Sequence, residues 1–319
     1  MRVLVTGGAG FIGSALVKRL VAEGHEVAVL DDGSRGNWNR LAGVNCHQLA
    51  GDVRDPVAVT AAMHGCDTVV HMAYPQGTQT FYANPRLVLD VATRGMRAVL
   101  GACEATGCRD LMLISSSEAY QVATVVPTPE TVPLTVPDPL NPRYSYGGGK
   151  ILCELMANAW HKDGVLDRVI IARPHNIYGP DMGREHVIPE FCLRMGDLAR
   201  EHPEGTIPFP IQGTGEETRS FCYITDCVDQ LTLLLERAEG IGVWHVGTQD
   251  EGTIRALAGM VGACYARDVK VIPGALPKGS PPRRLPAIAK IRALGWDAAG
   301  RTSFADGLAE TVAWYRERG

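Results

Sequence analysis

Three glycines spaced three residues apart, Gly7, Gly10 and Gly13, follow a short apolar run at the start of the chain. A helical pattern of apolar residues begins within the same loop at Phe11 and Ile12. In a strand–loop–helix unit the first glycine allows a tight turn and the second lets the backbone approach a pyrophosphate. The third lets the helix pack closely on the strand, so that the helix N-terminus faces the phosphates. The sequence therefore predicts a dinucleotide site lined by all five residues.

A second strand, expected over residues 25–30, ends in Asp31 and Asp32. A carboxylate at this place accepts hydrogen bonds from the adenosine ribose hydroxyls and repels a 2′-phosphate, which favours NAD over NADP. Arg35 and Arg40 follow closely. A basic side chain here can contact a 2′-phosphate, but we interpret both arginines as surface residues. The predicted cofactor is NAD.

Strand and helix patterns alternate through the first half of the chain, which is typical of a Rossmann-type, doubly wound parallel sheet in an α/β fold. Asp52 and Val53 follow the third expected strand, and we predict that they meet the adenine. Ala73 follows the fourth, at the carboxyl edge of the sheet where ligands bind in such folds. These three residues complete the predicted cofactor site.

The alternation ends near residue 176, where glycines, prolines and short apolar pieces predominate. We therefore predict an NAD-binding domain over residues 1–175, to which residues 220–247 return. Residues 176–219 and 248–319 are expected to form a smaller, discontinuous substrate lobe. The segment 127–142 contains six prolines and is expected to be neither helix nor central strand.

Composition excludes several other classes of protein. A formal charge of −4 over 319 residues gives no general attraction to nucleic acid or to an anionic membrane. No apolar run approaches the roughly 20 residues of a membrane span. The nine cysteines include no Cys-x-x-Cys pair, and most lie in apolar runs, as reduced core thiols do. We expect a cytoplasmic protein with no metal site.

Tyr146 and Lys150 are four residues apart in a predicted helix over residues 143–161, so they share one face. An ammonium beside a phenol favours the phenolate, and we expect Lys150 to lower the pKa of Tyr146 toward the working pH. Tyr146 would then act as the general base and Lys150 would also bind the nicotinamide ribose. The three glycines between them are poor helix formers. One hypothesis is that larger side chains there would collide with cofactor or substrate.

Ser116, Ser117 and Glu118 end another expected strand at the same edge of the sheet. A serine hydroxyl there can bond to the reacting oxygen and share its proton with Tyr146, and Ser116 is the first candidate, Ser117 the second. Glu118 is the more informative residue, because a carboxylate near a sugar ring can move protons at a second carbon. A solvated or helix-capping glutamate is the alternative interpretation.

These motifs, together with Arg173-Pro-His-Asn-Ile-Tyr-Gly-Pro180 and Arg219-Ser-Phe-Cys-Tyr-Ile-Thr-Asp226, resemble the extended short-chain dehydrogenase/reductase family. Within it, nearly the whole chain looks like the NAD-dependent nucleotide-sugar epimerase/dehydratase branch. The resemblance implies a nucleoside-diphosphate sugar that is oxidised at C4. It also implies that Asn176 contacts the diphosphate region, that Val187 lies in a segment walling the base and sugar, and that Arg219 and Arg284 bind phosphates. For Arg284 a surface arginine is the alternative.

The same resemblance leaves three reactions open. Members commonly carry Tyr-Gly-x-Ser-Lys where this chain has Tyr146-Gly-Gly-Gly-Lys150, and many 4,6-dehydratases carry an aspartate where Ser117 stands. Glu118 and the pattern Pro142-Arg143-x-x-Tyr146 resemble decarboxylases of nucleotide-linked uronic acids. We expect C4 epimerisation, which demands least beyond the placed residues, with 4,6-dehydration or decarboxylation through Glu118 as the alternatives.

Two further expectations concern function and assembly. A non-catalytic NAD-binding regulator is a remote alternative, because such a protein is expected to lose the tyrosine or the lysine. The family also implies a homodimer that forms through the helices expected over residues 84–106 and 143–161.

Overall fold

The computed structural model describes residues 1–276 and 279–318. A parallel sheet of seven strands forms its larger half, with strand order β11–β6–β5–β4–β1–β2–β3. The strands are β1 (Arg2–Thr6), β2 (Glu26–Asp31), β3 (His47–Ala50), β4 (Thr68–His71), β5 (Asp110–Ile114), β6 (Arg168–Pro174) and β11 (Ile241–Val246). The order reverses direction between β1 and β4, which creates the crevice at which nucleotides bind in such sheets. The predicted Rossmann-type α/β class is confirmed.

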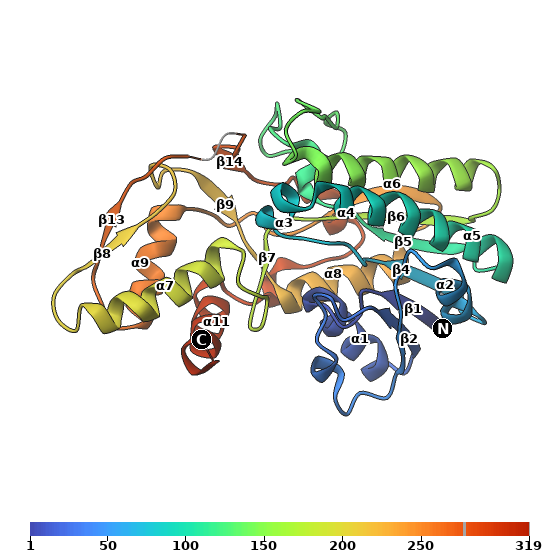
Figure 1. Cartoon of the computed structure of the whole chain (residues 1–319), viewed down its shortest axis with the longest axis horizontal. Helices are drawn as coiled ribbons and strands as arrows, with labels where there is room; N and C mark the ends of the chain where they lie inside the picture. Colours follow the sequence, from blue (N-terminus) through green and yellow to red (C-terminus); the bar gives the residue numbers. More distant parts are fainter. Residues whose placement is uncertain (277–278, 319) are drawn as a thin grey trace.

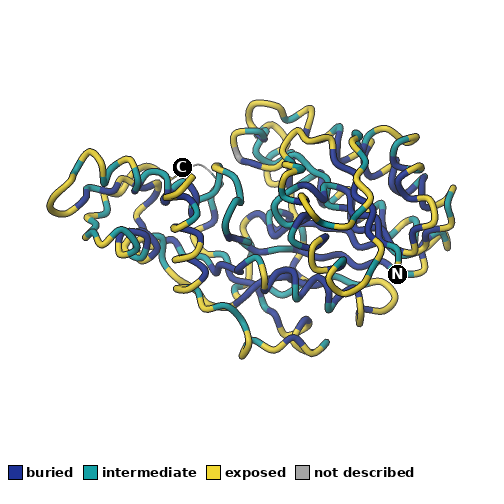
Figure 2. Tube along the Cα trace, turned by 90° about the horizontal axis from the view of Figure 1, so that it is seen from below, coloured by how far each residue is buried: buried dark blue, intermediate teal, exposed yellow. Residues whose placement is uncertain are grey.

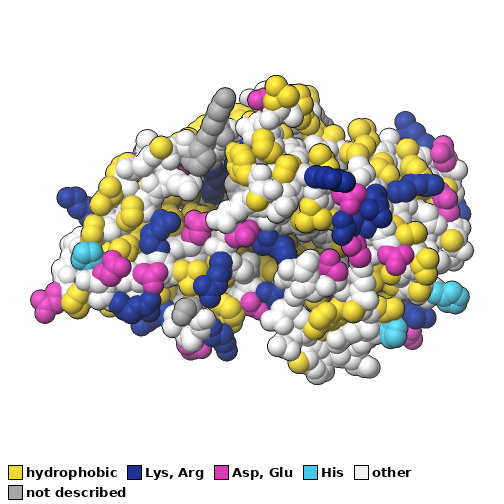
Figure 3. Space-filling model, in the orientation of Figure 1, with side chains coloured by type: hydrophobic (Ala, Val, Ile, Leu, Met, Phe, Trp, Pro, Cys, Tyr) yellow, Lys and Arg dark blue, Asp and Glu magenta, His cyan; other side chains and the backbone are white. Residues whose placement is uncertain are grey.

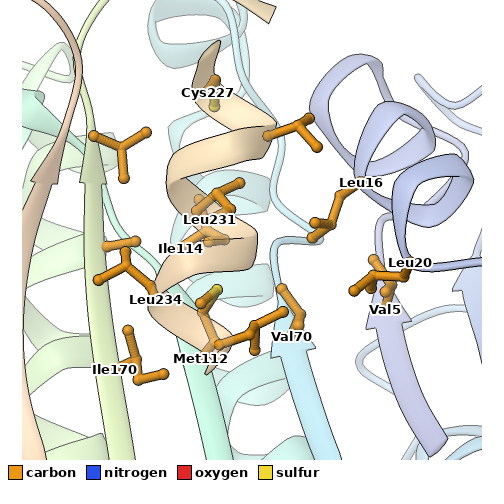
Figure 4. Close-up of a cluster of buried hydrophobic side chains, with 14 of the residues drawn as sticks. Val5, Leu16, Leu20, Val70, Met112, Ile114, Ile170, Cys227, Leu231 and Leu234 are labelled. Carbon is orange, nitrogen blue, oxygen red and sulfur yellow. The ribbon is translucent and has the colours of Figure 1, made fainter. Parts of the chain in front are cut away.

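Helices cover both faces of the sheet (Figure 1). On one face lie α1 (Phe11–Ala22) and α8 (Ile224–Arg237), and on the other lie α2 (Pro56–Met63), α5 (Met96–Thr106) and α6 (Tyr144–Lys162). Figure 4 shows Leu231 and Leu234 of α8 near Ile114 and Met112 of β5, and Leu16 and Leu20 of α1 near Val5 of β1. Burial of each such side chain contributes roughly 1.5–3 kcal/mol. These contacts fix the strand ends that carry the site.

Residues from the second half of the chain form a smaller lobe on the side of the molecule away from the N-terminus (Figure 1). Its helices are α7 (Val187–Glu201), α9 (Ile254–Cys264) and α11 (Phe304–Arg318), which pack together around β8 (Ile207–Pro210) and β13 (Val269–Ile272). Short strands β9 (Thr218–Ser220), β12 (Glu251–Thr253) and β14 (Arg283–Arg284) form a second small sheet. A further pair joins β7 (Ile177–Tyr178) to β10 (Cys222–Tyr223). Figure 2 shows that buried residues run through both halves.

The proposed division of the chain at residues 175, 220 and 247 stays a prediction. β11 lies at the edge of the main sheet and pairs with β6, and α8 packs on α1. Ile288, Ile291 and Trp296, which the division assigns to the lobe, pack in the same hydrophobic cluster as α8. They lie in and around α10 (Ala289–Ala293), which contacts β11.

Two connecting regions position the site. The segment 127–142 contains neither a named helix nor a named strand, as predicted. Its Thr128 donates its backbone N–H to Leu285 O at 2.8 Å and accepts from Ala287 N at 2.8 Å, which ties it to the chain just after β14.

The helix expected over residues 84–106 is divided into α4 (Pro85–Asp90), a π-helical segment (Val91–Gly95) and α5. No described helix is long and apolar enough to span a membrane.

Candidate active site

The glycine loop has the geometry that a dinucleotide requires. Gly7 has a φ of +74°, and a Cβ added there would lie 2.8 Å from the Cα of Ala73. A Cβ on Gly13 would lie 2.3 Å from Gly7 O, and one on Gly10 would lie 3.0 Å from the same oxygen. The loop therefore needs glycine for its own packing. Gly10 caps α1 without a side-chain bond and the first turn carries no acid, so the helix N-terminus is available to phosphate.

Asp31 lies beside this loop at the end of β2. Its carboxylate is buried and accepts hydrogen bonds from Ala9 N at 3.0 Å and Gly33 N at 2.9 Å. Because each carboxylate oxygen has two lone pairs, the group can still accept from ribose hydroxyls. Asp32 is exposed and accepts from Ser34 N at 2.9 Å. The contacts fit NAD, with Asp31 rather than Asp32 in the buried position.

Arg40 is not a surface residue, so that interpretation of the sequence is wrong. Its side chain is 14% exposed and its Nε lies 2.7 Å from Asp181 Oδ2. Its Nη1 donates to Ala9 O at 3.1 Å, so the guanidinium links the glycine loop to the chain after β7. Arg35 is 41% exposed and pairs with Glu185 at 3.2 Å. Both charges are therefore already matched by acids.

Of the three other predicted cofactor residues that follow strands, the structure places only Ala73 against the glycine loop. Asp52 accepts from Arg54 N at 2.8 Å and from Arg54 Nε at 3.0 Å, and the bond with Arg54 lowers its pKa. Val53 is buried against Gly95, where an added Cβ would lie 3.0 Å from the valine Cγ1. Ala73 is the close neighbour of Gly7 described above. The adenine contacts of Asp52 and Val53 stay predictions.

Tyr146 and Lys150 project from one face of α6 into the end of the sheet. Both are buried, and Lys150 Nζ donates a hydrogen bond to Ile114 O at 2.7 Å. Burial lowers the pKa of Lys150 to about 8. Burial also raises the pKa of Tyr146, which hydrogen bonding with Ser116 opposes and the charge of Glu118 reinforces. The pKa of Tyr146 is therefore raised and not lowered as the sequence suggested, because loss of hydration is the largest influence on it.

Packing within the protein explains two of the glycines between these residues, and the hypothesis of a collision with cofactor or substrate stays untested. A Cβ on Gly147 would lie 2.2 Å from Gln121 Nε2 and 2.8 Å from Glu118 O. A Cβ on Gly149 would lie 2.1 Å from Tyr74 Oη. At Gly148 the nearest atom, at 3.4 Å, is a valine methyl in ordinary contact. The helix approaches the protein itself too closely for side chains at two of the three positions.

The serine–glutamate segment follows β5 as a short 3-10 helix, Ser117–Tyr120. Ser116 caps it by accepting from Glu118 N at 3.1 Å and lies within hydrogen-bonding reach of Tyr146. Ser117 is buried. The geometry brings Ser116 and Tyr146 together as predicted from the sequence, although their catalytic roles stay predictions.

Glu118 forms an ion pair with Arg284 of β14, and their closest atoms are 2.6 Å apart. Burial alone would raise the pKa of this carboxyl, but the charges of Arg284, Arg143 and Arg219 together hold it below its ordinary value. Arg284 is 13% exposed and is therefore not a surface arginine. One carboxylate and three guanidinium groups thus meet near Tyr146, and we call this set the arginine cluster.

The other predicted substrate residues line the joint between sheet and lobe. Asn176 has a φ of +43° and donates its side-chain amide to Ser220 O at 2.8 Å. Val187 begins α7. Arg219 donates to Pro281 O at 2.8 Å, and burial lowers its pKa to about 10. Their contacts with a diphosphate, base or sugar stay predictions.

Comparison with known proteins agrees with this geometry. Residues 3–247 match the NAD dependent epimerase/dehydratase family. The chain belongs to this family. A UDP-glucuronic acid decarboxylase of Arabidopsis thaliana is 30% identical over 100% of this chain and 70% of its own length. One from Xenopus tropicalis is 32% identical over 99% of this chain and 72% of its own length.

Solved structures support the same assignment. DesIV, a dTDP-glucose 4,6-dehydratase from Streptomyces venezuelae with NAD bound, is 32% identical with a TM-score of 0.85, covering 99% of this chain and 97% of that one. The UDP-glucose 4-epimerase of Thermus thermophilus with NAD is 27% identical with a TM-score of 0.84, covering 99% of both chains. The chain is thus a member of an NAD-dependent enzyme family, and NAD is its cofactor.

Two aromatic residues beside Tyr146, Tyr74 and Phe81, were not predicted from the sequence. Tyr74 meets Tyr146 edge to face with ring centroids 5.1 Å apart, and Phe81 stacks on Tyr146 at 4.6 Å. They lie in the loop after β4 and in the following helix α3 (Thr78–Ala83). Their position at the carboxyl edge of the sheet was the available signal, but nothing in the sequence states which aromatic side chain turns inward.

Acidic and basic side chains are interspersed on the face shown in Figure 3. Many arginines form ion pairs, including Arg54 with Asp90 at 2.8 Å and Arg168 with Asp110 at 2.8 Å. In the described part of the chain, no group of three or more His, Cys, Asp or Glu side chains is placed to hold a metal ion.

Proposed function

We propose that this enzyme decarboxylates a nucleoside-diphosphate uronic acid after oxidising the sugar at C4. The observation that carries the proposal is the arginine cluster, in which Glu118 and the nearby Glu217 leave one of three guanidinium charges unmatched. A partly buried excess of positive charge favours an anionic partner. A uronic acid that carries a diphosphate supplies both a carboxylate and phosphates. The decarboxylase names of the relatives support the same reaction.

The residues of the site suit the first half of this reaction. Tyr146 takes the proton of the C4 hydroxyl, and Ser116 bonds to the same oxygen. NAD, when bound, would supply the hydride acceptor for C4, and its positive charge would favour the phenolate form of Tyr146. Lys150 stabilises that phenolate and retains N–H groups with which to hold the ribose.

The second half follows from the ketone at C4. The uronic acid is then a β-keto acid, so the C5–C6 bond can break and release carbon dioxide while its electron pair forms an enolate across C5 and C4. A proton from solvent adds to C5. The reduced cofactor would supply the hydride that restores C4, and Tyr146 would return its proton to the oxygen. In this scheme Arg284 orients the departing carboxylate, and Glu118 holds Arg284 in place.

Epimerisation, which we preferred from the sequence, and dehydration are less well supported. A 4,6-dehydratase needs an acid for the departing C6 hydroxyl, and Ser117 at that place is a poor proton donor. Glu118 is paired with Arg284 and its lowered pKa makes it a poor acid as well. An epimerase has no use for a third cation beside the sugar. Decarboxylation uses both the cations and the ionised glutamate.

Mass spectrometry of the NAD-loaded enzyme with a panel of nucleotide sugars in deuterated water tests the proposal. We expect carbon dioxide loss from a nucleotide-linked uronic acid, with one deuterium retained at C5. Loss of water from a hexose, or an unchanged mass with inverted C4, would refute decarboxylation and identify dehydration or epimerisation instead. A Tyr146→Phe variant controls for turnover by contaminating enzymes.

We further propose that the enzyme is a homodimer through α4 and α6, which pack against each other. Leu87 and Leu89 on α4 are 40% and 43% exposed, and Leu152 and Leu155 on α6 are 38% and 62% exposed. Two adjacent helices with exposed leucines offer an apolar surface suited to a second copy of the same helices. The cytoplasmic location stays a prediction; all nine cysteines are free thiols.

A further inference from the structure

Lys150 holds a buried charge without a carboxylate partner. Its side chain makes no ion pair within residues 1–276 and 279–318, and its one hydrogen bond goes to Ile114 O. The nearest acid along α6, Glu154, is already paired with Arg173. An unpaired buried ammonium is costly and tends to lose its proton. Some other group must therefore stabilise this charge.

The ring of Tyr74 occupies the place where such a group is needed. Lys150 Nζ lies 4.1 Å from the centroid of this ring, compared with 5.8 Å from the centroid of Tyr146. Aromatic faces carry partial negative charge and attract cations, most strongly where water is excluded. The same Tyr74 ring meets Tyr146 edge to face. It therefore contacts both members of the pair.

The hydroxyl of Tyr74 does not explain why the residue is there. Its oxygen is buried and has no hydrogen-bond partner among the described residues. It abuts Gly149, where an added Cβ would lie 2.1 Å from Oη. The chain thus accommodates a whole aromatic ring against α6 at the expense of an unsatisfied hydroxyl. The contacts that Tyr74 makes with Lys150 and Tyr146 are made by its ring.

We propose that Tyr74 is a positioning residue whose ring face keeps Lys150 protonated and aimed between Tyr146 and the nicotinamide ribose. The proposal rests on oxidation at C4, which the proposed function shares with its alternatives, and not on decarboxylation. The ring takes the part that a carboxylate takes elsewhere. Because the ring is neutral, it binds the Lys150 ammonium less tightly than a carboxylate would. The other N–H groups of the ammonium therefore stay available to the ribose.

Other titratable groups around Lys150 do not account for its charge. His71 of β4 bonds to Thr6 Oγ1 at 2.8 Å, and burial lowers its pKa to about 3, so it stays neutral. Burial raises the pKa of Cys153 to about 11, and it raises that of Tyr74 as well. Tyr146 also has a raised pKa. Lys150 is the group near this site that should titrate around pH 8.

Carbon-13 NMR of labelled lysine side chains in the NAD-loaded enzyme measures this titration directly. The sequence contains six lysines, so the spectrum is sparse, and Lys150→Met assigns the signal. We would replace Tyr74 by phenylalanine and by phenylalanines with increasing numbers of ring fluorines, which keep the shape but weaken the ring's attraction for cations. Tyr74→Leu removes the ring face altogether.

We expect Tyr74→Phe to leave the pKa of Lys150 within a few tenths of a unit. Progressive fluorination should lower it stepwise, and Tyr74→Leu should lower it by about one pH unit. The alkaline limb of the kcat/KM profile should move by the same amount. A Lys150 pKa that does not depend on fluorination would overturn the proposal, even if Tyr74→Leu failed to fold. Absence of any uronic acid turnover would instead count against the proposed function.

Discussion

Replacing Gly148 by alanine should stabilise the enzyme, whereas the same change one residue away should bring no such gain. A glycine in a helix interior costs about 1 kcal/mol relative to alanine. At Gly148 the new Cβ would meet only a Val136 methyl at 3.4 Å, which is ordinary van der Waals contact. We therefore expect the free energy of unfolding to rise by about 1 kcal/mol.

Gly147 and Gly149 have the same helical propensity but different surroundings. The added Cβ at Gly149 would lie 2.1 Å from Tyr74 Oη and 3.0 Å from Ala92 Cβ, and the one at Gly147 would lie 2.8 Å from a backbone oxygen. Overpacking of this kind costs about 1–3 kcal/mol, which cancels or exceeds the gain in propensity. Gly149→Ala should also displace Tyr74 from Lys150 and reduce turnover, which Gly148→Ala should leave intact.

Urea unfolding at one fixed NAD concentration compares the free energies of unfolding of the three variants. Bound NAD then stabilises each variant equally, provided that each binds NAD with the same affinity. Measuring NAD affinity for each variant completes the control. The reasoning would be refuted by a Gly148→Ala protein less stable than the wild type, or by a Gly149→Ala protein that is as stable and as active as Gly148→Ala.

Three other predictions use variants matched in the same way. Arg284→Met should lower kcat/KM by about 100-fold or more, because it leaves Glu118 unpaired. Arg283→Met breaks an exposed pair with Glu251 and should change kcat/KM less than about twofold. Equal losses in the two variants would contradict the role of the arginine cluster. The pKa of Lys150 is about 8 in the folded protein and ordinarily 10.5, so the unfolded chain binds more protons between pH 8 and pH 10.5. The free energy of unfolding should therefore rise with pH across this range, by about 3 kcal/mol relative to Lys150→Met. Parallel pH curves for the two proteins would refute this. Leu155→Glu should convert a dimer into a monomer in sedimentation at micromolar concentration, while Val57→Glu, at a more exposed position on α2, should not; a wild-type monomer would end the dimer proposal.

The fold was predictable because its signals are local. The glycine loop, the acidic end of β2 and the alternation of strand and helix each lie within a short stretch of sequence, and the structure confirms the sheet that they indicate. Local patterns were insufficient where tertiary packing decides the outcome. The helix over residues 84–106 contains a π-helical segment, and Arg40 turns inward to Asp181, 141 residues away. No periodicity in the sequence marks either feature.

The electrostatics of the site show the same limit. The i, i+4 spacing correctly places Tyr146 and Lys150 on one face, but it does not state how deeply the pair is buried. Burial reverses the expected direction of the tyrosine pKa and lowers that of Lys150. Gly147 and Gly149 are likewise required because Gln121 and Tyr74, which come from other loops, leave no room for a Cβ at these positions.

The choice among the three reactions depends on a contact between residues far apart in the sequence, the ion pair of Glu118 with Arg284. Taken alone, Glu118 suits a base at C5, a binding residue or a capping glutamate, which is why the sequence left three reactions open. Arg284 lies 166 residues further along the chain, and β14 places its guanidinium on this carboxylate while Arg283 turns to Glu251 on the exposed side. An ionised glutamate that holds an arginine has a different chemistry from a solvated one, because it orients a cation and is a weaker base. That distinction favours a substrate with its own carboxylate.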